Sequence, residues 1–258
     1  MTIYNLQMIK PYFELTGIGP STLLFIHGWG GNSNWWNQQR DYFAKSFKVA
    51  QMDLPGHGKS PMCGGELTSK KYVEAIRLVV DELPGEVILV AHSMAGAYVI
   101  ESTLQVSKIK MIILVDTLKN LDQVYTYEQA DKMIFDLYRK NFKDTMLNVM
   151  PAFLFSQKTS KNIQDSVIGE LLNLGAEKAI KLLAPFYQTD LKELAVKIRL
   201  PVRAINSDYS PANLENNIKY FKNYKSVTIS DCGHYPMLER PIEFNELLEN
   251  LLKSSLYK

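Results

Sequence analysis

The chain has 258 residues and a formal net charge of +2, with 29 basic and 27 acidic side chains. This length suits one α/β domain that carries an insertion, and the evenly mixed charges form no basic stripe, which excludes a nucleic-acid-binding protein. Its two cysteines have neither metal-ligand nor disulfide-framework spacing, and neither a bilayer-spanning run nor a signal peptide is evident, so we expect a cytoplasmic protein.

Apolar segments alternate with helical patterns along most of the chain. Residues 2–16 predict one or two edge strands, and further strands are predicted at 22–26, 47–52, 86–90, 111–115, 202–205 and 225–230. Helices are predicted at about 33–45, from Thr68 or Ser69 to Leu83, and directly after Gly96. Such alternation is typical of a mostly parallel sheet with helices on both faces.

The alternation stops between Thr117 and about Asp190. Four helical patterns follow one another there, at 127–141, 145–155, 162–174 and 176–187. We therefore predict a helical insertion in an otherwise regular α/β chain.

A serine stands where the strand at 86–90 passes into a helix, in the segment Ala91-His92-Ser93-Met94-Ala95-Gly96. A sharp strand-to-helix turn that raises a nucleophilic serine above the sheet needs small residues two positions before and two after it. Ala91 and Ala95 meet this requirement, although glycine is the usual residue. Ser93 is the candidate nucleophile.

A serine nucleophile needs a base and an orienting carboxylate. Of the four histidines, only His234 follows the last predicted strand, and histidine is the side chain suited to this task near neutral pH. Asp208 follows the strand at 202–205 and keeps the chain order of serine, acid and histidine. Asp116, at the end of the strand at 111–115, is an alternative acid, and we favour Asp208.

The strand at 22–26 breaks into a glycine-rich loop, His27-Gly28-Trp29-Gly30-Gly31. Such a loop can turn a main-chain N–H toward the serine, so we predict an oxyanion hole from the N–H groups of Trp29 and Met94. The same loop imitates a dinucleotide-binding fingerprint, with Asp53 twenty residues after Ser33. We reject that interpretation because Ser33 replaces the third glycine.

These motifs together resemble the α/β-hydrolase family, in particular serine carboxylesterases such as the pimeloyl-carrier-protein methyl esterases. The similarity includes segments 24–31 and 52–60, the serine turn, and Gly233-His234-Tyr235-Pro236. It implies a mostly parallel sheet of eight strands or nearly so, with a helical cap inserted after the sixth strand. Residues 118–190 would form the cap, and 1–117 with 191–258 the core.

The resemblance also implies a function: hydrolysis of a carboxylic ester or thioester of a small-molecule substrate through an acyl-enzyme, without a metal or an organic cofactor. Alternatives are a ligand receptor that keeps the three residues but turns over little, and a related carbon–carbon hydrolase, perhydrolase or lyase. The acyl group, the alcohol and the oligomeric state are not predicted.

Overall fold

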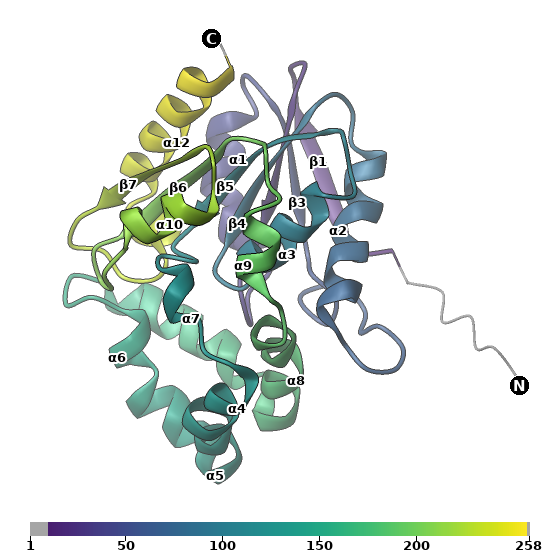
Figure 1. Ribbon diagram of the computed structural model, residues 1–258. Helices are drawn as coiled ribbons and strands as arrows, with labels where there is room; N and C mark the ends of the chain where they lie inside the picture. Colours follow the sequence, from purple (N-terminus) through teal and green to yellow (C-terminus); the bar gives the residue numbers. More distant parts are fainter. Residues whose placement is uncertain (1–9, 257–258) are drawn as a thin grey trace, which may run out of the picture.

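The computed structural model describes residues 10–256, which contain one seven-stranded sheet (Figure 1). The spatial order is β1-β3-β2-β4-β5-β6-β7, with β1 antiparallel to β3 and all other neighbours parallel. The strands are β1 Phe13–Gly17, β2 Thr22–Ile26, β3 Lys48–Met52, β4 Val87–His92, β5 Ile109–Val115, β6 Val202–Ser207 and β7 Tyr224–Ile229.

The central strands are apolar along their length because both of their faces are covered. Every residue of β2 and β4 is buried, and β5 is buried except at Lys110. In the register of the sheet Ile26 lies opposite Ala91, and His92 lies opposite Val115. The carboxyl ends of β2, β4 and β5 therefore meet at one edge, where polar residues from the following loops can converge.

Helices cover both faces of the sheet. On one face α1 (Asn37–Phe43) packs on α12 (Pro241–Leu256), and on the other α2 (Ser69–Glu82) packs on α3 (Ala95–Thr103). The remaining helices outside residues 127–187 are short: η1 Ser33–Trp36, η2 Leu121–Gln123, α9 Leu191–Ala195, α10 Leu214–Tyr220 and α11 Pro236–Glu239. The fold predicted from the sequence, an α/β sheet with helices on both faces, is confirmed.

The segment between β5 and β6 is helical and gathers at one end of the sheet, below it in Figure 1. It contains α4 Tyr127–Ala130, the π-helical turn η3 Asp131–Phe135, α5 Asp136–Asp144, the π-helical turn η4 Thr145–Val149, α6 Pro151–Leu154, α7 Lys161–Leu172 and α8 Gly175–Tyr187. These helices match the four predicted patterns to within a few residues.

The seven described strands agree with the predicted sheet of eight strands or nearly so. Of the one or two edge strands predicted at 2–16, the described residues contain β1, and residues 1–9 lie outside them. The helical segment follows β5, the fifth described strand in chain order.

Candidate active site

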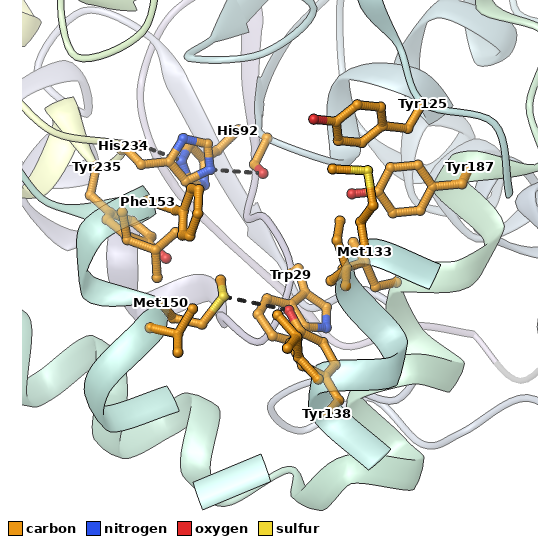
Figure 2. Close-up of a pocket in the computed structure, with 16 residues that line it drawn as sticks. Trp29, His92, Tyr125, Met133, Tyr138, Met150, Phe153, Tyr187, His234 and Tyr235 are labelled. Carbon is orange, nitrogen blue, oxygen red and sulfur yellow. Dashed lines mark hydrogen bonds between the residues drawn. The ribbon is translucent and has the colours of Figure 1, made fainter. Parts of the chain in front are cut away.

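A cavity of about 310 Å³ lies between the helices of the β5–β6 segment and the carboxyl edge of the sheet (Figure 2). Ser93 and His234 form part of its wall, and the other side chains around it are almost all apolar or aromatic. They are Trp29, His92, Tyr125, Met133, Ile134, Leu137, Tyr138, Val149, Met150, Phe153, Leu154, Leu183, Tyr187 and Tyr235. Among residues 10–256, no Asp, Glu, Lys or Arg side chain lines this cavity.

A second, more open cleft of about 510 Å³ meets the cavity at Ser93 and His234. Its wall is more polar and includes Thr117, Asn120 and Gln123. The serine hydroxyl thus stands where an apolar space and a polar one join.

Ser93 occupies the turn between β4 and α3 in a left-handed conformation, with φ of +54°. A non-glycine residue in this region is strained by about 1–3 kcal/mol and persists only where the surrounding structure fixes it. Here Ala91 and Ala95 are fully buried, and the N–H of Ser93 donates to the carbonyl of Val115 at 3.1 Å. The turn has the geometry predicted for a nucleophile-bearing elbow.

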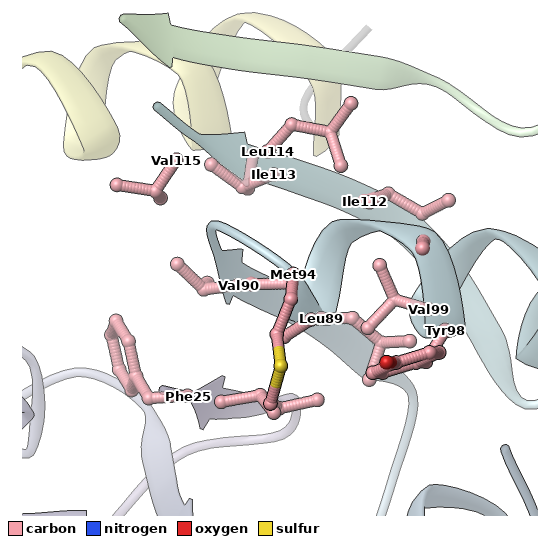
Figure 3. Close-up of a cluster of buried hydrophobic side chains, with 14 of the residues drawn as sticks. Phe25, Leu89, Val90, Met94, Tyr98, Val99, Ile112, Ile113, Leu114 and Val115 are labelled. Carbon is pink, nitrogen blue, oxygen red and sulfur yellow. The ribbon is translucent and has the colours of Figure 1, made fainter. Parts of the chain in front are cut away.

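Met94 anchors the other side of this turn. Its side chain is buried in the core among residues of β2, β4 and α3 (Figure 3). Its main-chain N–H has no hydrogen-bond partner within residues 10–256, and the same is true of the N–H of Trp29.

Gly28 allows the loop after β2 to lie against the serine turn. A Cβ at this position would stand 2.8 Å from the Cβ of Ser93 and 2.7 Å from Nδ1 of His92, too close for any side chain. Farther along the loop, Trp29 is fixed by its Nε1, which donates to the carbonyl of Ala179 at 2.9 Å. The loop therefore passes beside Ser93, as an oxyanion-binding loop must.

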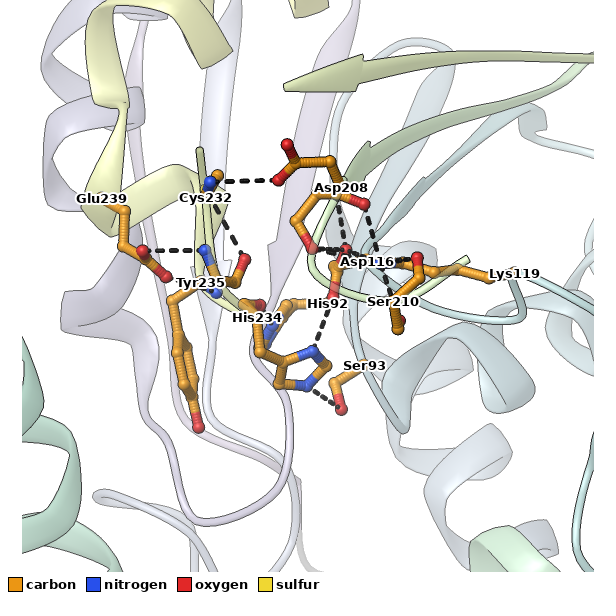
Figure 4. Close-up of polar contacts among 12 residues, drawn as sticks. His92, Ser93, Asp116, Lys119, Asp208, Ser210, Cys232, His234, Tyr235 and Glu239 are labelled. Carbon is orange, nitrogen blue, oxygen red and sulfur yellow. Dashed lines mark hydrogen bonds and ion pairs between the residues drawn. The ribbon is translucent and has the colours of Figure 1, made fainter. Parts of the chain in front are cut away.

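His234 and Ser93 meet although 141 residues separate them in sequence. Nε2 of His234 lies 2.9 Å from Oγ of Ser93, and Nδ1 lies 2.7 Å from Oδ2 of Asp116 (Figure 4). With Nδ1 as donor to the carboxylate, Nε2 is left as the acceptor of the serine proton. The three side chains form one continuous line of hydrogen bonds.

Asp208, the acid favoured from the sequence, does not make this contact. Its carboxylate accepts the N–H groups of Asp231 at 2.9 Å and Cys232 at 3.2 Å, which lead into the His234 loop. The prediction that Asp208 contacts His234 is wrong, and the alternative, Asp116, holds that place. Asp116 follows β5, which lies next to the serine strand β4, and the carboxylate of Asp208 is instead occupied by the main chain of the His234 loop.

The second oxygen of Asp116, Oδ1, is surrounded by donors. The N–H and the hydroxyl of Ser207 lie at 2.6 and 2.7 Å, and Nζ of Lys119 lies at 2.7 Å. Burial alone would raise the pKa of Asp116, but the hydrogen bond and charge of His234 together with Lys119 outweigh it and lower the pKa to about 2. Asp116 is therefore ionised near neutral pH.

His92, next to Ser93, holds the main chain of His234. Its Nε2 donates to the main-chain carbonyl of His234 at 2.7 Å. Burial and the nearby His234 lower the pKa of His92 to about 3, so it stays neutral. The contacts of His92, Ser207 and Lys119 were not predicted from the sequence; the one signal for Lys119 was its place three residues after a candidate acid.

Among residues 10–256, no three His, Cys, Asp or Glu side chains are grouped as a metal site would require. Within the same residues, no helix combines the length and apolarity that crossing a bilayer needs.

Known proteins resemble this chain over almost its whole length. It is 25% identical to a pimeloyl-[acyl-carrier protein] methyl ester esterase of Wigglesworthia glossinidia brevipalpis, covering 95% of this chain and 99% of that protein. A protein of the same name from Nitrosospira multiformis is 24% identical, covering 92% and 95%.

Solved structures agree on the fold. An esterase from Exiguobacterium antarcticum superposes with a TM-score of 0.81 at 17% identity, covering 94% of this chain and 95% of that one. An enol-lactonase from Burkholderia xenovorans superposes with a TM-score of 0.80 at 17% identity, covering 94% and 96%. The family model described as "Alpha/beta hydrolase family" matches residues 23–247. The chain therefore belongs to the alpha/beta hydrolase family, which confirms the resemblance seen in its sequence.

Proposed function

We propose that this protein is a serine hydrolase that cleaves a carboxylic ester through an acyl-enzyme, with Ser93 as nucleophile, His234 as base and Asp116 as orienting acid. The observation that carries the proposal is the line of contacts from Asp116 through His234 to Ser93, at 2.7 and 2.9 Å. The names of its relatives, which are esterases, support the same class of reaction.

In the first half of the proposed reaction, Oγ of Ser93 attacks the ester carbonyl carbon while Nε2 of His234 accepts its proton. The negative charge that develops on the carbonyl oxygen is received by the N–H groups of Trp29 and Met94. The tetrahedral intermediate then breaks its bond to the alcohol oxygen, which leaves with the proton from His234. Asp116 keeps Nδ1 protonated and stabilises the imidazolium.

In the second half, water takes the place of the alcohol. His234 accepts a proton from the water as its oxygen attacks the acyl carbon, and returns that proton to Oγ as the acid is released. Neither half requires electrons or groups from outside the substrate, water and these side chains.

The apolar wall of the cavity supports a particular class of substrate. Since no Asp, Glu, Lys or Arg side chain of the described residues lines the 310 Å³ space, a charged group buried there would lose its hydration without compensation. We propose that this space takes an uncharged, apolar acyl chain and that the polar cleft takes the alcohol. The names of the bacterial relatives describe a methyl ester of a protein-carried acyl group, which fits a substrate with a small alcohol.

We further propose that residues 118–190 act as a cap domain over the site, with 1–117 and 191–258 as the core. Eleven of the sixteen residues around the cavity belong to this segment, from Tyr125 to Tyr187. A cap with this position would exclude water from the acyl chain and control its entry.

Labelling with a fluorophosphonate probe tests the nucleophile. Ser93→Ala should abolish labelling and ester turnover, whereas Ser107→Ala, at an exposed serine near the opposite end of β5, should leave both unchanged. Labelling that persists in Ser93→Ala would contradict the assignment. Wild-type turnover of p-nitrophenyl esters no faster than that of Ser93→Ala would point instead to a ligand receptor.

A series of p-nitrophenyl esters from acetate to laurate tests the cavity. We expect kcat/KM to rise with acyl length until the chain fills the cavity, and an acyl chain that ends in a free carboxylate to react more slowly than its uncharged analogue. Ile134→Trp should shift the optimum toward shorter chains because Ile134 lines the cavity. Leu147→Trp, at an exposed residue outside the cavity wall, is the matched control. An optimum that moves equally in both variants would contradict the assignment of the cavity.

A further inference from the structure

A buried lysine stands directly behind the proposed acid. The side chain of Lys119 is only 9% exposed, and its Nζ lies 2.7 Å from Oδ1 of Asp116 (Figure 4). The same ammonium lies within hydrogen-bond distance of the carbonyl and hydroxyl oxygens of Ser207, at 2.9 and 3.1 Å, and of Ser210, at 3.2 and 3.1 Å. All its polar contacts are to the acid or to the turn after β6.

Removing an ammonium from water is costly, and a buried pair rarely stabilises a fold more than apolar residues of the same volume would. Lys119 does not contact Ser93 or His234, and the proposed mechanism does not use it. Its burial therefore suggests a task that a neutral side chain could not perform.

The contacts divide the carboxylate of Asp116 into two halves. Oδ1 receives three donors, from Lys119 and from the N–H and hydroxyl of Ser207, whereas Oδ2 receives His234. Donors fixed on one oxygen prevent rotation of the carboxylate and hold the other oxygen toward the imidazole. Asp116 itself has a strained backbone, with φ of +46°, so its conformation needs such support.

We infer that Lys119 is a positioning residue: it holds Asp116 toward His234 and offsets part of the negative charge that the imidazole faces. This inference rests on the proposed function. An uncompensated carboxylate favours the imidazolium, which cannot accept the proton of Ser93. Replacing the ammonium with a neutral group should therefore favour the imidazolium.

Few other groups can act on Asp116 in the same way. The titratable groups that face it, from the end of β4, the turn after β6 and the loop after β7, are His92, Asp208, Cys232, His234 and Tyr235. Burial keeps His92 neutral and raises the pKa of Cys232 and Tyr235, so these three stay uncharged near pH 7. Among the described residues, Lys119 is thus the lysine that forms an ion pair with Asp116.

The test is the pH dependence of kcat/KM and of the labelling rate of Ser93, measured from about pH 5 to 9. Lys119→Met should shift the acid limb upward by roughly half a unit to one unit and lower the plateau by roughly tenfold or more. Lys119→Arg keeps the charge and should restore the wild-type position of the limb. Lys119→Gln keeps a donor without the charge, so it should retain more of the plateau but still show the shift.

Lys108→Met is the matched control. Lys108 is also partly buried and donates to main-chain carbonyls, but it lies at the opposite end of β5. It should leave both limb and plateau unchanged. If Lys119→Met does not fold, Lys119→Gln carries the test alone.

An acid limb that stays in place in both neutral variants would overturn the inference, whatever happens to the plateau. That result would leave the proposed function intact as long as Ser93→Ala abolishes labelling. Labelling that survives in Ser93→Ala would instead refute the proposed function, independently of Lys119.

Discussion

The turns after β5 and β6 are built alike but carry their aspartates into different surroundings. Each aspartate follows the end of its strand, and each donates its N–H to the next strand, Asp116 to Ile205 at 2.9 Å and Asp208 to Ile229 at 3.1 Å. Yet the side chain of Asp116 is only 4% exposed and meets four donors, whereas Asp208 is exposed and meets two main-chain N–H groups.

The different contacts of Asp116 and Asp208 show that each segment holds a different part of the site. The turn after β5 carries Asp116, and the last residue of β6, Ser207, donates two hydrogen bonds to its carboxylate. Asp208, one residue later, accepts two main-chain hydrogen bonds from the loop that leads to His234. An acidic residue at a strand end is therefore not sufficient for contact with His234: Asp116 follows the strand next to β4 and has donors on its second oxygen, whereas Asp208 accepts main-chain N–H groups of the His234 loop.

The largest expected effect comes from Asp116→Asn. An amide cannot hold Nδ1 of His234 in the protonated form, so kcat should fall about 10⁴-fold, as in other hydrolases with this arrangement. Steady-state kinetics on a p-nitrophenyl ester, with circular dichroism to verify folding, measures it. Activity within tenfold of wild type would mean that the carboxylate is not the orienting group.

Much of this fold was predictable because burial leaves a periodic trace in sequence. The strands buried on both faces are continuous apolar runs such as 87–91, and the helices of the 127–187 segment show a 3.6-residue period. The contact between Ser93 and His234 was predictable too, since the strand-to-helix turn has strict steric demands and one histidine follows the last strand.

Which aspartate contacts His234 was not predictable in the same way. Asp116 and Asp208 both satisfy the order of serine, acid and histidine, and both end a strand. The choice depends on which strand lies next to β4 and on donors such as Ser207, 91 residues away from Asp116. Pairings over such separations leave no local pattern in a single sequence.

A smaller effect is expected from Ser207→Ala. The variant removes the hydroxyl from Oδ1 but leaves the N–H of Ser207 and the ammonium of Lys119, so kcat/KM should fall by roughly tenfold. Ser102→Ala is the matched control, because this buried serine donates to the carbonyl of Tyr98 in α3, away from the acid. Equal losses of activity in the two variants would indicate a general loss of stability rather than a loss of support for Asp116.

The depressed pKa of Asp116 also predicts a pH dependence of stability. A carboxyl whose pKa falls from 3.8 to about 2 on folding adds stability above pH 3.8, and this stability is lost as the pH falls toward 2. In Asp116→Asn the free energy of unfolding should therefore change less between about pH 4 and 2 than in the wild type. Urea unfolding at several pH values measures both slopes, and identical slopes would contradict the assigned shift.

The smallest effect is expected from Asp208→Asn. Hydrogen bonds from the N–H of Asp231 and Cys232 lower the pKa of Asp208, so its charge steadies the loop before His234. The asparagine still offers an oxygen to one of these donors, and the side chain is exposed, so kcat/KM should stay within about twofold of wild type.

The decisive comparison adds Asp208→Asn to Asp116→Asn. If Asp208 could take over as the acid, the double variant would lose the residual activity of Asp116→Asn. If the two turns have separate roles, the residual activity of the double variant should match that of Asp116→Asn. The second substitution would then affect only the hydrogen bonds to the loop before His234 and not the contact between Asp116 and the imidazole.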